Sequence, residues 1–322
     1  MHIPDGLLSV PVAVAYGASS LLCVGVACRR LRATRERGSS ALLGVCAAFI
    51  FAAQMVNFPV GAGTSGHLIG STLGVTLLGL PGALIVMTAV LFVQCFVFGD
   101  GGVFALGANV FNMALVGCVV GHCCYRLLCG TAPSPRRRVA AVAFASWCAT
   151  VAAAISCAEQ LSLSGTARGA VVFLAMLGVH ALIGVGEAVI TALIIATVLR
   201  FRPELLGASD EPRAGARAGS AVWAGLGLSL AVAVLLAPLA SASPDGLTQI
   251  ARSLGLRGQE RASLAEYVGL VLGRGLLVTA FAGSVATLLL FGACWLLARA
   301  LVPRTTAAPD RLASRAAVES SG

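Results

Sequence analysis

Residues 169–199 read GAVVFLAMLGVHALIGVGEAVITALIIATVL, a stretch that contains one acidic residue and no basic one. A helix of about 20 mainly apolar residues is long enough to cross the hydrocarbon core of a bilayer. The stretch therefore predicts a membrane-spanning helix. Eight further stretches have the same apolar character: 7–28, 41–58, 66–80, 82–98, 103–128, 138–158, 221–240 and 276–299. We expect an all-α polytopic transmembrane bundle, with about seven core helices and two additional C-terminal spans.

Two of these stretches, 66–80 and 82–98, are short and are separated only by Pro81-Gly82. Proline and glycine interrupt helices, because proline lacks the backbone N–H and glycine allows unusual backbone angles. One of the two stretches is therefore either a complete span or a broken, re-entrant element.

Composition supports a membrane protein and excludes several other classes. Hydrophobic residues make up 58% of the 322-residue chain, charged residues 11%, and the mean hydropathy is +0.94. Soluble domains carry about 25% charged residues. All 22 basic residues are Arg, so the chain lacks the Lys of a P-loop and cannot be an ATPase of that type by itself. The net charge is +9, but the Arg residues that produce it are clustered between apolar stretches, which is not the pattern of a nucleic-acid-binding face.

The placement of Arg predicts the orientation in the membrane. Of the 22 Arg residues, 17 fall in four segments that nine spans put on one side: 29–38, 126–138, 200–217 and the tail after 298. Arg-rich loops face the cytoplasm. The N-terminus is therefore predicted to face out, together with the loops at 57–67 and 98–102. No basic residue precedes Arg29, so we expect the first apolar run to be retained rather than cleaved as a signal peptide.

The domain organisation is predicted from shifts in composition. Residues 1–200 form a membrane core, 201–220 a cytoplasmic linker, 221–302 a C-terminal accessory region with two spans, and 303–322 a polar, disordered tail. Between the last two spans, residues 241–274 form the only long polar segment expected outside, with SPDGL at 243–247 and an amphipathic patch near 247–270.

The N-terminal residues Met1-His2 suggest a metal chelate. Histidine is the commonest metal ligand among side chains. The amine of Met1, the backbone nitrogen of His2 and the imidazole of His2 can close two small rings on one ion. Met1 is expected to persist because His is too large a second residue for removal of the initiator. A frayed terminus without a role is the alternative interpretation.

A second predicted outer histidine, His67, can supply the fourth nitrogen. It lies in GTSGHLIG, where Gly63 and Gly66 permit sharp turns and close backbone approach. A planar four-nitrogen site suits Ni(II) or Cu(II), and could hold Co(II) with some adjustment. Binding displaces protons from the amine and the amide and should weaken as the pH falls. A histidine that caps a turn is the alternative for His67.

Polar side chains within or beside the apolar stretches form a further set. Such residues usually face the interior of a helix bundle. His180 and Glu187 are two helical turns apart and share a face. A polar pathway or a second shell around the ion is one interpretation, and hydrogen bonds that lock the helices together are the other. The set comprises Asn57, Ser65, Gln94, Asn109, Asn112, His180 and Glu187.

Four long motifs resemble the CbiM/NikM family, the substrate-specific components of energy-coupling-factor (ECF) transporters for cobalt and nickel. They are MHIPDGLLS (1–9), FAAQMVNFPVGAGTSGHLIGS (51–71), FVFGDGGVFALGANVFNMALVG (96–117) and GVHALIGVGEAVITA (178–192). The motifs occur in family order and the resemblance covers residues 1–199. Ser71 departs from the second Gly of the family's GHLIGG-like run.

The resemblance implies a function, a site and partners. Met1, His2 and His67 would bind Co2+ or Ni2+ as the transported substrate, with no organic cofactor and no enzymatic activity. The partners would be an ECF transmembrane coupling protein and two cytoplasmic ATPases in a bacterial cell membrane. The region 241–300 resembles the PDGLE-type region of such systems, although Thr248 stands where the family often has Glu. Residues 221–302 would then fill the role of a small accessory membrane subunit.

Two other functions remain compatible with the residues. The chain could be a passive divalent-metal channel or a metal-sensing membrane protein that acts without ATPases. A membrane metalloenzyme is the third class, but it needs an open coordination position and a general base near the ion. Asp5 and Asp100 are the carboxylates that the sequence places near the site.

Overall fold

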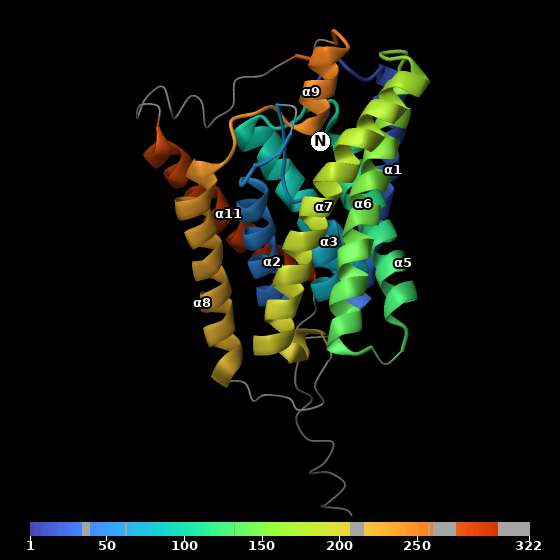
Figure 1. Cartoon of the computed structure of the whole chain (residues 1–322). Coiled ribbons are helices and arrows are strands. Elements are labelled where there is room, and N and C mark those ends of the chain that lie inside the picture. The colour runs from blue at the N-terminus through green and yellow to red at the C-terminus, as the bar shows by residue number, and fades with distance from the viewer. Residues whose placement is uncertain are drawn as a thin grey trace, which may run out of the picture.

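Apolar helices that lie side by side make up most of the computed structural model (Figure 1). It describes residues 1–33, 39–61, 63–131, 133–206, 216–256, 258–259 and 275–301. The elements are α1 (Val10–Ala33), α2 (Ser39–Gln54), β1 (Phe58–Gly61), β2 (Thr64–Gly66), α3 (Ser71–Val93), η1 (Gln94–Phe98), α4 (Leu106–Asn109), η2 (Val110–Val116), α5 (Gly117–Cys129), α6 (Pro135–Leu163), α7 (Gly169–Phe201), η3 (Pro203–Leu206), α8 (Ala216–Ala231), η4 (Val232–Leu236), η5 (Ala237–Leu239), α9 (Gly246–Ser253) and α11 (Leu276–Leu301).

The bundle is apolar outside and contains polar groups inside, as a protein in lipid requires. Seven helical segments of the described chain are long and apolar enough to cross a membrane, and Ser40–Gln54 is a shorter apolar helix. Leu174 is 72% exposed and Leu277 is 86% exposed, whereas Gln54 and Glu187 are buried. The predicted all-α, polytopic membrane fold is confirmed, with one small β-hairpin added to it.

Helix α3 reverses direction near its start, so it consists of two pieces. Gly79 has φ 69° and ψ 172°, which are not helical angles. A Cβ on Gly74 would lie 3.2 Å from the Cβ of Ala83, whereas residues nine apart in a straight helix are separated by about 13 Å. The piece that begins at Ser71 is about 12 Å long and cannot cross a bilayer.

This reversal shows which of the two short predicted spans, 66–80 and 82–98, is long enough to cross the membrane. The stretch 66–80 was expected to be helical from its start, but it becomes a helix only at Ser71. It is a re-entrant half-helix, because the buried, non-helical backbone from His67 to Gly70 leads into it from inside the bundle. The returning piece of α3 with η1 is the membrane-spanning element. The N-terminal end of the half-helix consequently lies inside the protein.

The Arg-rich ends of the helices lie opposite the N-terminus (Figure 1). Arg residues occupy the last turn of α1, α5, α7 and α11. Nη1 of Arg138, at the start of α6, donates to the carbonyl of Leu206 at 2.8 Å. Under the positive-inside rule this end is cytoplasmic, and the end that carries the N-terminus and α9 is external.

Several predicted segments fall wholly or partly outside the described residues. They are the linker 201–220, the tail 303–322 and half of the amphipathic stretch 247–270, whose described part contains α9. The domain boundaries therefore remain predictions.

The C-terminal region attaches to the core at two levels. Within the membrane, α8 and α11 pack against α2. At the outer end, the backbone N–H of Ser241 donates to the carbonyl of Asn57 at 2.8 Å, and that of Ser65 donates to the carbonyl of Pro244 at 2.9 Å. The segment 57–67, expected as a loop, is an antiparallel hairpin of β1 and β2. Ser65 also forms a parallel bridge with Asp245, so the SPDGL segment lies along β2.

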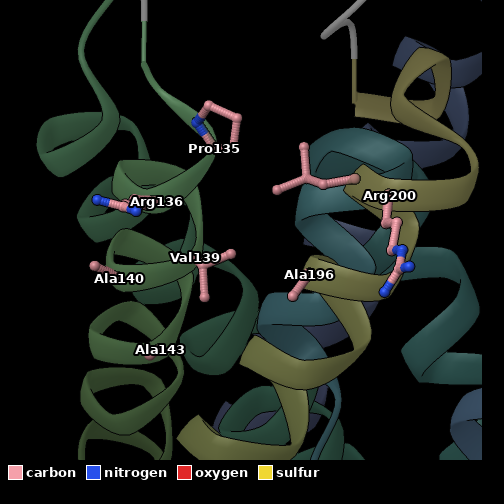
Figure 2. A pocket seen from close by; sticks show the side chains of 8 residues that line it. Pro135, Arg136, Val139, Ala140, Ala143, Ala196 and Arg200 are labelled. Carbon is pink, nitrogen blue, oxygen red and sulfur yellow. The ribbon is translucent and has the colours of Figure 1, made fainter.

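A groove opens where α6 and α7 separate near the cytoplasmic end (Figure 2). Its volume is about 530 Å³. The lining residues are Pro135, Arg136, Val139, Ala140, Ala143, Ala196, Leu199 and Arg200. These residues include no His, Cys or carboxylate, so the groove offers no side-chain ligands for a transition metal.

Candidate metal site at the N-terminus

The N-terminus is folded into the protein at the outer end of the bundle. Met1 is 3% exposed and Ile3 is fully buried. The rings of His2 and His67 stack with their centroids 5.4 Å apart. The ammonium of Met1 donates to Oδ2 of Asp245 at 2.5 Å. The structure therefore brings Met1, His2 and His67 together, and it adds a carboxylate that sequence reasoning did not place there.

Each imidazole is oriented by an oxygen that accepts a hydrogen bond from one ring nitrogen. Nε2 of His2 lies 3.1 Å from Oε1 of Gln94, and Nδ1 of His67 lies 2.8 Å from the carbonyl of Leu68. An oxygen of this kind can only accept, so those two nitrogens carry the protons. Nδ1 of His2 and Nε2 of His67 keep lone pairs for an ion. Metal-binding histidines characteristically have their second nitrogen held in this way.

The protonation of both histidines suits metal binding. Burial, followed by the nearby Met1 ammonium, lowers the pKa of His67 to about 4. The same causes hold the pKa of His2 well below its usual value. Both imidazoles are therefore neutral at pH 7, which is the form that coordinates a metal ion.

A chain of amide groups fixes the position of Gln94. Its Nε2 donates to Oε1 of Gln54 at 2.6 Å. Nε2 of Gln54 in turn donates to the carbonyl of Ile69 at 2.5 Å. The chain runs from His2 through Gln94 in η1 and Gln54 at the end of α2 to Ile69, in the segment that carries His67. It therefore ties the two histidines to the same rigid elements.

The first residues are held by a second set of backbone and side-chain contacts. Oδ1 of Asn109 accepts the N–H of Ile3 at 2.8 Å, and Nδ2 of Asn109 donates to the carbonyl of Ile3 at 3.1 Å. The N–H of Gly102 donates to the same carbonyl at 2.8 Å. Asp5 accepts backbone N–H groups from Val103 and Phe104 at 3.0 and 2.9 Å. The FGDGG segment and the residues that follow it thus support the N-terminal chain.

The non-helical segment that carries His67, residues 67–70, is anchored by α7. The carboxylate of Glu187 accepts the N–H of Ile69 at 2.5 Å and that of Gly70 at 2.9 Å. These donors lie at the buried N-terminal end of the half-helix, where a negative group is favourable. Gly66 permits close approach, since a Cβ there would lie 2.9 Å from Cγ1 of Ile183. Glu187 therefore holds the segment 67–70 in position. Its contacts support the interpretation in which polar side chains join parts of the bundle by hydrogen bonds.

Asp245 comes from the SPDGL segment and is the main residue that sequence reasoning missed. Its Oδ1 accepts the N–H of Thr248 at 2.8 Å and caps α9. Burial alone would raise the pKa of Asp245, but the Met1 ammonium and Thr248 hold that pKa well below its usual range. The nearest carboxylate to the amine is therefore Asp245, and not Asp5 or Asp100 as the sequence suggested. The PDGL motif at 244–247 is the sequence feature that could have drawn attention to Asp245.

The other polar residues of the predicted set have different positions. Hydroxyl Oγ of Ser65 donates to the carbonyl of Ser243 at 2.7 Å and so holds the SPDGL segment in place. Asn57 contributes its carbonyl to the same interface. His180 lines a cavity of about 10 Å³ with Met1 and His67. Among the described residues, its buried Nε2 has no hydrogen-bond partner.

Asn112 is not part of this site. It pairs with Gln160 at 2.9 Å and accepts from the hydroxyl of Ser156 at 2.7 Å. These contacts join η2 to α6 and none of them involves the N-terminal residues. The contacts of Asn112 therefore support the interpretation in which its hydrogen bonds hold two helices together.

A multi-pass helical bundle that encloses a free amine and two neutral histidines defines a class: membrane proteins suited to handle a transition-metal ion. The family model described as "cobalt uptake substrate-specific transmembrane region", CbiM, matches residues 2–205. That match covers more than half of the chain, so the chain belongs to the CbiM family.

Relatives in sequence and structure agree with this family. The chain is 38% identical over 214 residues to the "putative fused nickel transport protein NikMN" of Archaeoglobus fulgidus, covering 66% of this chain and 70% of the relative. It is 34% identical over 254 residues to the "fused nickel transport protein NikMN" of Rhodobacter capsulatus, covering 74% and 72%. A solved "transition metal transporter" superposes with a TM-score of 0.57 and 33% identity, covering 66% of this chain and 100% of that chain.

Proposed function

We propose that this chain is the substrate-binding membrane component of an ATP-driven, ECF-type uptake transporter for Co2+ or Ni2+. The amine of Met1, the backbone nitrogen and Nδ1 of His2, and Nε2 of His67 capture the ion. Membership in a cobalt-uptake family and the names of the nickel-transport relatives support the type of substrate.

One observation carries the proposal: the proton of each histidine is held away from the nitrogen that the chelate needs. Backbone N, Cα, Cβ, Cγ and Nδ1 of His2 close a six-membered ring on an ion, and Nε2 cannot close it. Nε2 is the nitrogen bonded to Gln94. The amine and the backbone nitrogen close a second, five-membered ring. Nε2 of His67 then completes a planar set of four nitrogens, which suits Ni(II) and can accept Co(II).

The driving force must come from partner proteins. The chain contains no Lys and therefore no P-loop. We propose a transmembrane coupling protein and two cytoplasmic ATPases as partners. The C-terminal region, which packs against α2 and lies along β2, is proposed to replace a separate accessory subunit.

Metal uptake into vesicles tests this function. The chain is reconstituted with the candidate coupling protein and ATPases, with ATP enclosed at the cytoplasmic face and Ni2+ or Co2+ outside. We expect uptake that stops when the ATPase P-loop lysine is replaced. Uptake by the chain alone, at the same rate with or without ATP, would instead favour a passive channel.

A further inference from the structure

Asp245 gives the N-terminal site a carboxylate from outside the core. Single ligand atoms of His2, His67 and Asp245 all lie within 4.8 Å of one another. Oδ1 of Asp245 caps α9 through Thr248. Oδ2 faces the site and lies 2.5 Å from the nitrogen of Met1. One oxygen thus fixes the side chain and the other is directed at the proposed chelate.

We propose that Asp245 is a fifth ligand of the transported ion, bound through Oδ2 on the axis of the four-nitrogen plane. The inference rests on the proposed function, since it adds a ligand to that site. Nitrogen and oxygen ligands lie about 2.1 Å from a first-row ion, so two ligands at a right angle are about 3 Å apart. Oδ2 and the Met1 nitrogen need to separate by only about 0.5 Å from their present contact to occupy such positions.

The charge of the site calls for this carboxylate. A divalent ion bound by a neutral amine, an amide anion and two neutral imidazoles carries one net positive charge. Leaving that charge buried without compensation is costly. Asp5 and Glu187 each use both oxygens on backbone N–H groups. Asp245 is the acidic residue grouped with the two histidines among the described residues.

A fifth ligand also changes which metal the site prefers. Four planar nitrogens favour Ni(II) and Cu(II) over other divalent ions. An axial oxygen gives a square-pyramidal set, which stabilises high-spin Co(II) more than it stabilises planar Ni(II). Asp245 is therefore a specificity-determining residue that raises the affinity for Co(II) relative to Ni(II), and the C-terminal region supplies it.

Metal titration of the purified full-length chain tests the proposal. Co(II) and Ni(II) affinities and the visible spectrum of the Co(II) complex are measured for the wild type, Asp245→Asn, His2→Ala and Glu204→Gln. Asparagine still caps a helix N-terminus, so the first change removes the charge and retains the cap of α9. Glu204→Gln is the control, because it removes a carboxylate that pairs with Arg202 at the opposite end of the bundle.

We expect Asp245→Asn to lower the Co(II) affinity about 100-fold and the Ni(II) affinity about tenfold or less, at the upper end of the losses seen around metal sites. The wild-type Co(II) spectrum should be that of a five-coordinate ion, a result that needs no variant. A planar four-coordinate spectrum in the wild type, or equal losses for both metals, overturns the inference. If His2→Ala abolishes binding while Asp245→Asn changes nothing, the fifth ligand is wrong and the chelate stands. Native affinity in His2→Ala refutes the proposed chelate itself.

Discussion

The predicted core, residues 1–200, and the predicted C-terminal region, residues 221–302, contribute to one site in different ways. The core supplies nitrogen groups that are close in sequence, Met1 and His2, and orients them through residues on other helices. The C-terminal region supplies one carboxylate, Asp245, at the tip of a segment that lies along β2. In the core, buried hydrogen bonds preorganise the proposed ligands. In the C-terminal region, a short helix and its cap present a single group.

This difference indicates a division of roles. Ligands held by a buried network should determine whether an ion binds at all. A carboxylate brought by an appended region should adjust how tightly it binds and which ion is favoured. Substitutions in the two regions should therefore differ in size and in metal dependence, and the following predictions are ordered by expected effect.

His2→Ala and His67→Ala should each abolish high-affinity binding of both metals, because each removes one nitrogen of a preorganised set. Isothermal titration of the purified variants with Ni(II) and Co(II) measures the loss. His122→Ala is the control, since His122 lies on α5 near Arg126, toward the cytoplasmic end. Near-native affinity in either of the first two variants would refute the four-nitrogen site.

Gln94→Leu should lower metal affinity about 10- to 100-fold, because residues that orient a ligand contribute on this scale. The oxygen that holds the proton of His2 on Nε2 is lost, and the ring can rotate. Gln160→Leu is the matched control, as Gln160 is equally buried but pairs with Asn112. The same titration measures both variants, and equal losses would show that the effect is one of general stability.

Glu187→Gln should destabilise the folded protein by about 1–3 kcal/mol, because one buried backbone N–H at Ile69 or Gly70 would lose its acceptor. Thermal unfolding in detergent measures the change. Glu204→Gln removes a carboxylate paired with Arg202 at the cytoplasmic end, and it should cost no more than about 1 kcal/mol. An unchanged unfolding temperature in Glu187→Gln would contradict the anchoring role.

Thr248→Glu should have the smallest effect. It places an acidic side chain in the first turn of α9, where a negative charge is favourable by about 0.3–1 kcal/mol. The unfolding temperature should rise slightly, and the metal affinities should remain within about threefold, since a difference of 0.6 kcal/mol corresponds to that factor. A large loss of binding would mean that the SPDGL segment is positioned more critically than the cap of α9 suggests.

Much of the core could be predicted from the sequence, because its signals are local. Long apolar runs require lipid, Arg segments indicate orientation, and Met1-His2 contains three nitrogens of the proposed chelate within two residues. Pro81-Gly82 indicated a break between the third and fourth hydrophobic stretches, with a re-entrant element as one possibility. The sequence did not indicate which stretch is re-entrant or that the break falls at Gly79, because the same residues are compatible with a kinked helix.

The remaining features depend on contacts between distant residues. Asp245 and Met1 are 244 positions apart. Neither the SPDGL motif nor the N-terminal sequence indicates that the two residues are in contact. The pairing of Gln94 with His2 spans 92 positions. The sequence placed Gln94, Asn112 and Glu187 in one class of polar residues. Their contacts in the folded protein distinguish them. Gln94 orients His2, Asn112 joins two helices, and Glu187 anchors the segment 67–70.

The central claim is that the amine of Met1 is itself a ligand, and blocking it is the most direct test. One glycine retained before Met1 converts the amine into an amide and moves the free amine out of the chelate. The extended protein and a C-terminally extended control are titrated with Ni(II) and Co(II), with thermal unfolding to verify that both are folded. We predict that the N-terminal extension abolishes high-affinity binding and that the C-terminal one does not. Normal binding by the folded, N-terminally extended protein would contradict the account.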